Sequence, residues 1–285
     1  MRFFTSIGQG WSFMKEAISM GFRDRTLLRP SIYLVITTIL YYAAWVGALI
    51  AADVDFEKHT AWILIGIAVF GSFFIFYFFC GMTVNMVDAH LEGKTPSAGE
   101  AFRDARQNIF AIIWMAIISS IVSIFTSMLR NDDSVIGRII AGIINTIWTT
   151  LTFLMLPAII IEDVSMGQAL RRVRELHKQN LLLIGVGEVG VRFVTGLVGV
   201  VVYIAVAGVV YLSVDVIGGT PGIVIAIVTG GTMIALHAAF STFVRMAYYT
   251  CLYLWARDVE KQGQSAPAPL PLARAIGQVP TYDNP

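Results

Sequence analysis

Six long apolar runs are the feature that most constrains how this chain can fold. Each run reaches about 20 residues or more, the length that a helix needs to cross a hydrocarbon core about 30 Å thick. Only 14% of the 285 residues are charged and 56% are hydrophobic, whereas soluble domains carry about 25% charged residues. The sequence therefore predicts an all-α, polytopic membrane protein. The expected spans lie at 31–52, 61–88, 109–129, 139–161, 181–214 and 221–256.

The connections between the runs predict how the spans are grouped. The short segments "DVDFEKHT", "RNDDS" and "DVIGGTPG" join consecutive runs into three helical hairpins. Longer charged segments precede each hairpin, and they predict amphipathic helices on the cytoplasmic side. These segments are either remnants of a threefold repeat or simply typical basic approaches to a membrane helix. We expect an interfacial amphipathic segment at 1–29, a transmembrane domain at 30–260 and a Pro-rich cytoplasmic tail at 261–285.

The N-terminal segment carries its apolar residues at spacings of three and four. This periodicity indicates one apolar helical face, which either lies in the membrane interface or packs beneath the helix bundle. The face contains Phe3, Phe4, Ile7, Trp11, Met14 and Ile18.

Lysine and arginine are distributed unequally between the two sides of the expected topology. Fifteen of them lie in the N-terminal segment, the two long connections and the tail, and only Lys58, Arg130 and Arg138 lie on the opposite side. The positive-inside rule then predicts that both termini are cytoplasmic. Since the sequence has no eukaryotic targeting signal and no N-x-[ST] sequon, we expect the inner membrane of a prokaryote.

The stretch "GVGEVGVRF", which begins at Gly185, contains the G-x-G-x-x-G pattern of a dinucleotide-binding turn. That pattern needs a strand before it and a helix after it, but here apolar helical sequence lies on both sides. A nucleotide site is therefore not predicted. Small residues let membrane helices approach closely, so we interpret Gly185, Gly196 and Gly199 as helix-packing positions.

The same region carries charged residues inside apolar runs. Glu188 and Arg192 are four residues apart, and a polar stripe of His237, Ser241 and Arg245 follows the sixth run at intervals of four. If the core begins near Leu181, Arg192 lies roughly 16 Å deep, close to the midplane.

Charges at that depth are costly, so these groups must face one another, water or a neighbour. Two interpretations stay open, a structural ion pair between the fifth and sixth helices and a polar conduit. Two arginines against one glutamate would favour anions if the conduit is wet.

Other polar positions carry weaker signals. Asn85, Asp88 and His90 are interpreted as solvated helix-end residues. Asn145, Thr149 and Thr152 are expected to form hydrogen bonds within or between helices.

Cofactor and enzyme signatures do not accompany these positions. Cys80 and Cys251 are expected to be buried small hydrophobic residues. The four histidines are scattered, and no metal-ligand spacing or catalytic motif is present. We therefore expect no metal, no cofactor and no enzymatic activity. A net charge of only +1 gives no support to nucleic-acid binding.

The tail after Gly263 contains prolines that prevent a long helix. It is either disordered or a segment in which "LPLARAIG" docks on a neighbouring subunit. Expected partners are membrane lipids, further copies of the chain and a protein bound through this tail.

Two stretches resemble a known family. The stretch "WTTLTFLMLPAIIIEDVSMGQALRRVREL", from Trp148 to Leu176, has a Trp/Thr-rich start, then Pro157 and Glu162, and a basic helix that begins near Ala169. Together with the N-terminal "GQGWSFMKEA" and "LLRPS", they resemble an uncharacterised prokaryotic family of six-helix integral membrane proteins, a domain of unknown function. The resemblance implies the six-helix layout for most of residues 1–256 and no catalytic residues.

The functional expectation is a non-enzymatic, homo-oligomeric membrane protein with a channel-like polar conduit near the fifth and sixth helices. A scaffold that binds partners without flux is one alternative. A secondary transporter is another, although the repeats all begin on the cytoplasmic side rather than being inverted.

Overall fold

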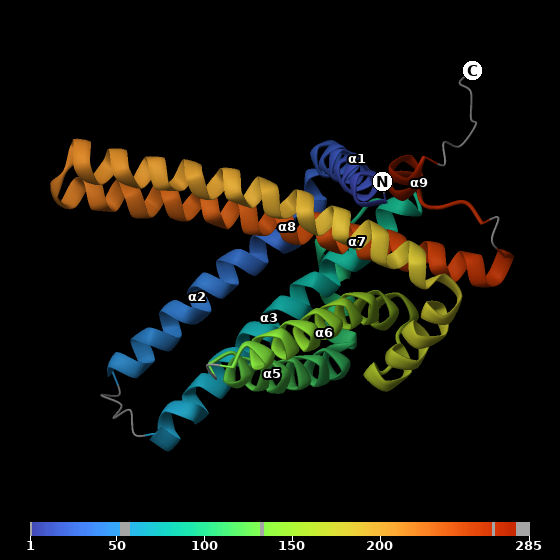
Figure 1. Ribbon diagram of the computed structural model, residues 1–285, viewed down its shortest axis with the longest axis horizontal. Coiled ribbons are helices and arrows are strands. Elements are labelled where there is room, and N and C mark those ends of the chain that lie inside the picture. The colour runs from blue at the N-terminus through green and yellow to red at the C-terminus, as the bar shows by residue number, and fades with distance from the viewer. Residues whose placement is uncertain (1, 52–57, 132–133, 264–265, 278–285) are drawn as a thin grey trace. The chain divides into compact units, whose positions relative to one another are not determined.

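The computed structural model describes the backbone of residues 2–51, 58–131, 134–263 and 266–277, and side chains at 2–7, 58–59, 61, 176–190, 192 and 276 lie outside that description. Helices and the short connections between them make up the described residues, with no strand among them (Figure 1). The elements are α1 (Arg2–Arg23), η1 (Arg25–Leu28), α2 (Arg29–Ala51), α3 (Lys58–Leu91), α4 (Ala98–Gln107), α5 (Ile109–Asn131), α6 (Val135–Glu162), α7 (Met166–Tyr211), η2 (Leu212–Ile217), α8 (Gly219–Gln262) and α9 (Leu270–Ile276).

Six helices are long and apolar enough to cross a membrane, as the sequence predicts. They are Arg25–Ala51, Trp62–Leu91, Ile109–Asn131, Val135–Glu162, Phe193–Ile217 and Gly219–Gln262. The all-α class with six candidate spans is therefore confirmed.

The chain divides into two compact units, and the divisions fall inside helices α2 and α7. One unit contains residues 1–35 and 180–285, and the other contains residues 36–179. Both expected cysteines are fully buried, Cys80 in the second unit and Cys251 in the first.

In the first unit, α1 packs against α8 and α9 through one face. This inner face consists of Phe13, Met14, Ala17 and Met20, none of them more than 6% exposed, and the Phe13 ring meets Tyr248 of α8 edge-on at 5.2 Å. Trp11, a member of the apolar face expected from the sequence, is 44% exposed and lies on the side of α1 opposite to this inner face. The side chains of Phe3, Phe4 and Ile7 lie outside the described residues.

The tail forms a short helix, α9, that packs on α1 of the same chain (Figure 1). Its residues Leu272 and Ala273 are 3% exposed. The chain leading to it is held by Trp255 of α8, whose indole Nε1–H donates to the carbonyl of Ala266 at 3.1 Å. Within "LPLARAIG", Leu272 and Ala273 are thus covered by the same chain, whereas Leu270 is 48% exposed.

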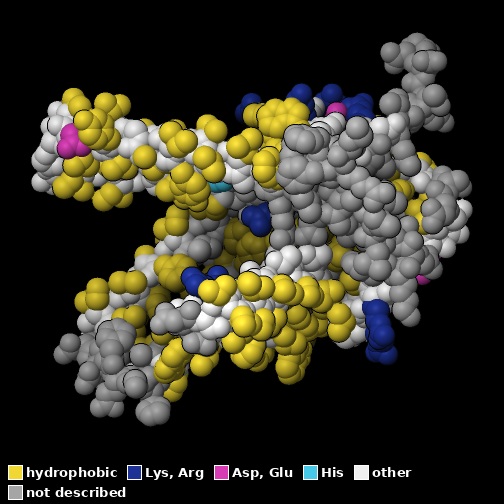
Figure 2. All heavy atoms as spheres, viewed as in Figure 1, with side chains coloured by type: hydrophobic (Ala, Val, Ile, Leu, Met, Phe, Trp, Pro, Cys, Tyr) yellow, Lys and Arg dark blue, Asp and Glu magenta, His cyan; other side chains and the backbone are white. Residues whose placement is uncertain are grey.

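The second half of α7 and the first half of α8 form a long antiparallel pair joined by the π-helical turn η2 (Figure 1). The turn needs glycine. Gly218 and Gly219 have φ values of 70° and 61°, and a Cβ on Gly222 would overlap the backbone carbonyl oxygen of Ser213. Many hydrophobic side chains are visible on the projecting part of this pair (Figure 2).

In the second unit, α3, α5 and α6 pack together, with α4 against α3. A buried hydrogen-bond network joins the three long helices at Ser119 of α5. Its hydroxyl lies 2.8 Å from the Tyr77 hydroxyl of α3 and accepts the indole N–H of Trp148 of α6 at 2.9 Å. Because Ser119 is only 1% exposed, this network fixes the three helices in one register.

Candidate functional site

The polar stripe expected on the sixth span lies on α8 with its members one turn apart. The Ser241 hydroxyl lies 3.4 Å from Nε2 of His237. Ser241 is 7% exposed, and Arg245 is half-buried. The parts of α8 before and after this stripe differ in burial. Residues 223–236 include many exposed apolar side chains, whereas residues 246–256 are buried.

Helix α7 makes room for this stripe at Gly199. A Cβ there would lie 3.0 Å from Nε2 of His237, and the ring of Tyr203, one turn further along α7, meets the His237 ring edge-on at 6.3 Å. Gly196 differs from Gly199, since a Cβ on Gly196 would meet no atom within 4 Å. Of these two glycines, Gly199 packs against α8 and Gly196 opens onto the surface.

Three of the expected site residues, Gly185, Glu188 and Arg192, have no described side-chain surroundings. The side chains of Glu188 and Arg192, and the surroundings of Gly185, lie outside the described residues, although the backbone there belongs to α7. Because α7 is one helix across the G-x-G-x-x-G pattern, no strand precedes it, as a nucleotide-binding turn would require. The ion pair between Glu188 and the arginines stays a prediction.

Burial along α8 indicates where a bilayer fits this helix best. The segment from Gly219 to about residue 240 exposes large apolar side chains, among them Ile227 at 68% and Leu236 at 60%. Arg245 lies about 39 Å along the axis from Gly219, further than the thickness of a core of about 30 Å. If the bilayer covers this exposed segment, Arg245 lies near the headgroups. If Arg257 instead marks the end of the span, Arg245 lies near the midplane.

A second polar cluster, which sequence reasoning did not assemble, lies in the other unit. The amide Nδ2 of Asn85 in α3 donates to Oδ2 of Asp104 in α4 at 3.0 Å. Asn108, the residue that ends α4, donates from Nδ2 to Oδ1 of Asp163 at 2.8 Å. These contacts join α3, α4 and the end of α6, so Asn85 is not simply a solvated helix-end residue.

Asp163 ends α6 in an unusual backbone conformation. Its φ of 51° places it in the left-handed region, which non-glycine residues seldom adopt. Aspartate tolerates this region better than most residues, and the hydrogen bond from Asn108 holds its side chain there. The signal in the sequence is weak, because Asn108 and Asp163 are 55 residues apart.

The cluster brings two carboxylates close enough to influence each other. Burial, and secondarily the negative charge of Asp163, raise the pKa of the Asp104 carboxyl, while the hydrogen bond from Asn85 acts in the opposite direction. Within the described part of the chain, no group of three His, Cys, Asp or Glu side chains is arranged to hold a metal ion. The arrangement can lock helices together and respond to protons.

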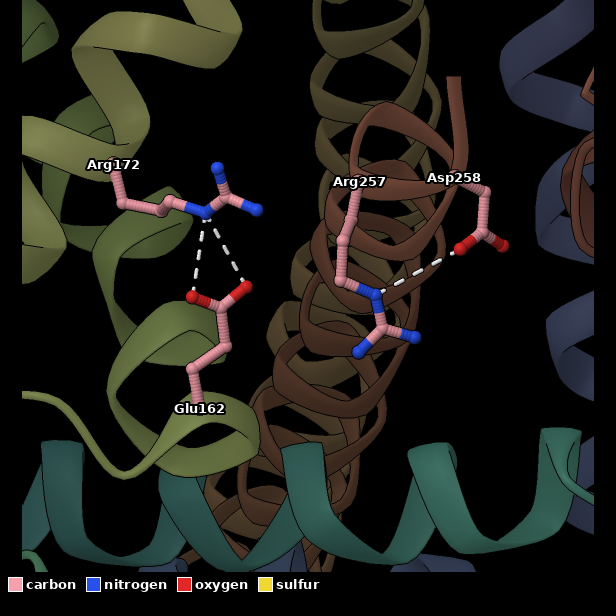
Figure 3. A network of polar contacts seen from close by, with 4 residues as sticks. All are labelled: Glu162, Arg172, Arg257 and Asp258. Atoms are coloured by element: carbon pink, nitrogen blue, oxygen red, sulfur yellow. Dashed lines mark hydrogen bonds and ion pairs between the residues drawn. The ribbon is translucent and has the colours of Figure 1, made fainter. Parts of the chain in front are cut away.

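The connection from α6 to α7 is also fixed by side chains. Nε of Arg172 lies 3.3 Å from both carboxylate oxygens of Glu162, as Figure 3 shows. Ser165 precedes α7, and its backbone N–H donates to Oε1 of Gln168 in the first turn of the helix at 2.9 Å. Figure 3 also shows a looser contact within α8, with Nε of Arg257 3.7 Å from Oδ1 of Asp258.

A third feature lies on α6, in the middle of a candidate span. Arg138, Gly142 and Asn145 are exposed and Thr149 is half-buried, and their spacing of three and four places them on one face. Within the described residues the Asn145 amide makes no hydrogen bond. A Cβ on Gly142 would meet no atom within 4 Å. The hydrogen bond expected for Asn145 is therefore not found in the described part of the chain, whereas the Thr152 hydroxyl donates to the Trp148 carbonyl at 3.0 Å, as expected.

These features define an all-helical protein with the helices of a multi-pass membrane protein. The family model for a family of unknown function, DUF6159, matches residues 60–263, and the chain belongs to this family. The resemblance to an uncharacterised family is thus confirmed, and the matched range runs from near the start of α3 to the end of α8. A comparison with curated proteins gives no match.

Proposed function

We propose that this chain is a non-enzymatic multi-pass membrane protein that works as a homo-oligomer, assembled through the exposed polar face of α6. The face consists of Arg138, Gly142, Asn145 and Thr149. The observation that carries the proposal is the exposed amide of Asn145, about 15 Å along α6 from Val135 and thus near the middle of a core about 30 Å thick.

An amide at this depth requires a partner. A hydrocarbon environment offers no hydrogen bonds, so an unpaired polar group there is costly. An asparagine amide both donates and accepts, and the same residue of a second copy related by a twofold axis can therefore satisfy it. The open position at Gly142 supports close approach of the two helix backbones.

The oligomeric state of the full chain in nanodiscs and in mild detergent tests this proposal. We expect wild type to be oligomeric and Asn145→Leu to shift the equilibrium towards monomers, since an interhelical polar contact contributes about 0.6 kcal/mol on average and up to about 2 kcal/mol. Gly142→Leu should have a larger effect, because a Cβ at this position meets no described atom within 4 Å, whereas a leucine side chain would block the close approach of a second helix.

Ile143→Leu is the matched control, since Ile143 is 54% exposed on another face of the same helix. A monomeric wild type, or equal assembly of all four proteins, would show that this face does not mediate association.

A channel-like conduit is the second candidate function, and the polar stripe His237–Ser241–Arg245 supports it. A stripe of this kind on an otherwise apolar α7–α8 pair provides polar groups where a path could open. Ion flux into liposomes containing wild type, Arg192→Gln or Arg245→Gln at matched folded protein tests it. Flux that is lost or changes its anion selectivity in the variants supports a conduit.

Absence of flux from wild type above empty liposomes would instead favour a membrane scaffold.

The proposed topology has six spans paired into three hairpins, with the amphipathic helices and both termini on the cytoplasmic side. The unequal distribution of lysine and arginine supports this orientation. The inner membrane of a prokaryote is the proposed location, and a protein partner at the tail and secondary transport are the remaining hypotheses.

A further inference from the structure

Helix α1 has two faces, and only one of them packs against the protein. The inner face contacts α8 and α9. The opposite side, here called the outer face of α1, consists of Trp11, Lys15, Ile18 and Phe22. Trp11 is 44% exposed and Phe22 is 71% exposed. Two large exposed aromatic side chains on one helical face mark a surface that interacts with something.

Positive charge gathers at the end of this face. Arg23, Arg25 and Arg29 are exposed, and none of the three forms an ion pair within the described residues. Nζ of Lys15 lies over the Trp11 ring, 5.6 Å from its centroid. Lys and Arg side chains are visible along the edge where α1 lies in Figure 2.

The neighbouring carboxylates are already engaged elsewhere. Glu16 points to the other side of α1, where its Oε2 lies 2.9 Å from Nη1 of Arg274 in α9. Asp24 begins η1, and its Oδ1 accepts from the backbone N–H of Thr26 at 3.0 Å. The outer face therefore keeps an excess of positive charge.

The position of this face in the chain identifies what covers it. Arg25 and Arg29 lie at the start of the first candidate span, Arg25–Ala51. The ends of membrane spans meet the headgroup layer, where tryptophan is enriched and where arginine and lysine meet lipid phosphates. Aromatic side chains reach into the acyl boundary while guanidinium groups form paired hydrogen bonds to phosphate.

We propose that the outer face of α1, with Arg23, Arg25 and Arg29, binds the headgroups of anionic phospholipids in the leaflet where α2 begins. Lys15 and the arginines supply charge complementarity, and Trp11 and Phe22 anchor the helix in the headgroup layer. This lipid-binding surface lies in the first unit and does not depend on the oligomer proposed through α6.

The first test compares lipid retention by the full chain. Wild type and the triple variant Arg23→Gln, Arg25→Gln, Arg29→Gln are released from nanodiscs of phosphatidylcholine with phosphatidylglycerol, and bound lipid is counted by native mass spectrometry. Each basic residue near an anionic leaflet contributes roughly five-fold in affinity, so retention of phosphatidylglycerol should fall up to about a hundred-fold in the variant. Retention of phosphatidylcholine should not change.

The control is Arg103→Gln, Arg106→Gln, Arg171→Gln, which removes the same charge from three exposed arginines of the other unit. It should retain phosphatidylglycerol as wild type does. Equal retention of the two lipids by wild type, or an equal loss in both triple variants, would overturn the proposal.

A second measurement reads the surface directly. A bimane label on Phe22→Cys, with the native cysteines buried, should be quenched more by brominated phosphatidylglycerol than by brominated phosphatidylcholine. Equal quenching by the two lipids would contradict the preference for anionic headgroups. Absence of quenching by either lipid would mean that a protein covers this face and would overturn the proposal.

Discussion

Nη1 of Arg274 lies 2.9 Å from Oε2 of Glu16, although 258 residues separate them in the sequence. This contact ties the helix of the C-terminal tail to the first helix of the chain. The Arg274 side chain is 46% exposed, however, and half-exposed ion pairs contribute only about 0–1 kcal/mol. The burial of Leu272 and its neighbours should therefore hold α9 more strongly than the ion pair does.

This difference predicts the effect of substitutions in α9. Leu272→Asp should release α9 from α1, because it places a carboxylate at a position that is 3% exposed. Arg274→Gln should have only a small effect. Hydrogen exchange of residues 266–277 measures both. Leu270→Asp is the control, since Leu270 is 48% exposed, and loss of protection in that variant too would contradict the assignment.

The network at Ser119 leads to a second prediction. Ser119→Ala removes the acceptor of the Trp148 indole N–H and one hydrogen-bond partner of the Tyr77 hydroxyl, which keeps its contact with the Thr152 side chain. Leaving the indole N–H unsatisfied costs about 1–3 kcal/mol in a buried site, and less where lipid-embedded groups find substitutes. Thermal unfolding in detergent should show a lower Tm for Ser119→Ala. Ser127→Ala, at an exposed position of α5, should unfold as wild type does.

The turn between α7 and α8 gives a matched pair of glycine substitutions. Gly222→Ala should strongly destabilise this turn, because the added methyl group overlaps the carbonyl oxygen of Ser213 and backbone atoms cannot move aside easily. Gly231→Ala lies in the same helix and meets nothing within 4 Å. It should be neutral or stabilising by roughly 0.5–1 kcal/mol. Tm values of the two variants, measured in the same detergent, should differ in this order.

The sequence predicted the six spans because length and hydropathy are local properties that a helix needs in order to cross a bilayer. It did not predict the orientation of α1. Spacings of three and four indicate an apolar face without saying whether lipid or protein covers it, so both alternatives stayed open for Trp11. The docking of Leu272 on α1 was likewise not predicted.

Contacts between distant segments account for the other differences. The left-handed conformation of Asp163 accompanies a hydrogen bond from Asn108, and no local pattern connects these two residues. Asn145 was expected to bond within or between helices, but the packing of α3 and α5 against α6 decides which face of α6 is exposed. The sequence predicted that His237, Ser241 and Arg245 share one face of α8. Their depth in a bilayer was not predicted, because it depends on which part of α8 is buried by protein.

The Asp104 carboxyl leads to the last prediction, which concerns pH. Burial and the charge of Asp163 raise its pKa in the folded protein above the ordinary value of 3.8. The folded state then binds this proton more tightly than the unfolded state, so ionised Asp104 destabilises the fold at pH values above the raised pKa. This destabilisation should disappear as the pH falls through the raised pKa.

Asp104→Asn removes the charge and keeps an oxygen that can accept from Asn85. Relative to wild type, it should raise the Tm at pH 7 and lose this advantage towards pH 4. Glu175→Gln, at an exposed position of the same unit, controls for the loss of one carboxylate. A Tm difference between Asp104→Asn and wild type that is constant over this pH range would show that the ionisation of Asp104 is not coupled to folding.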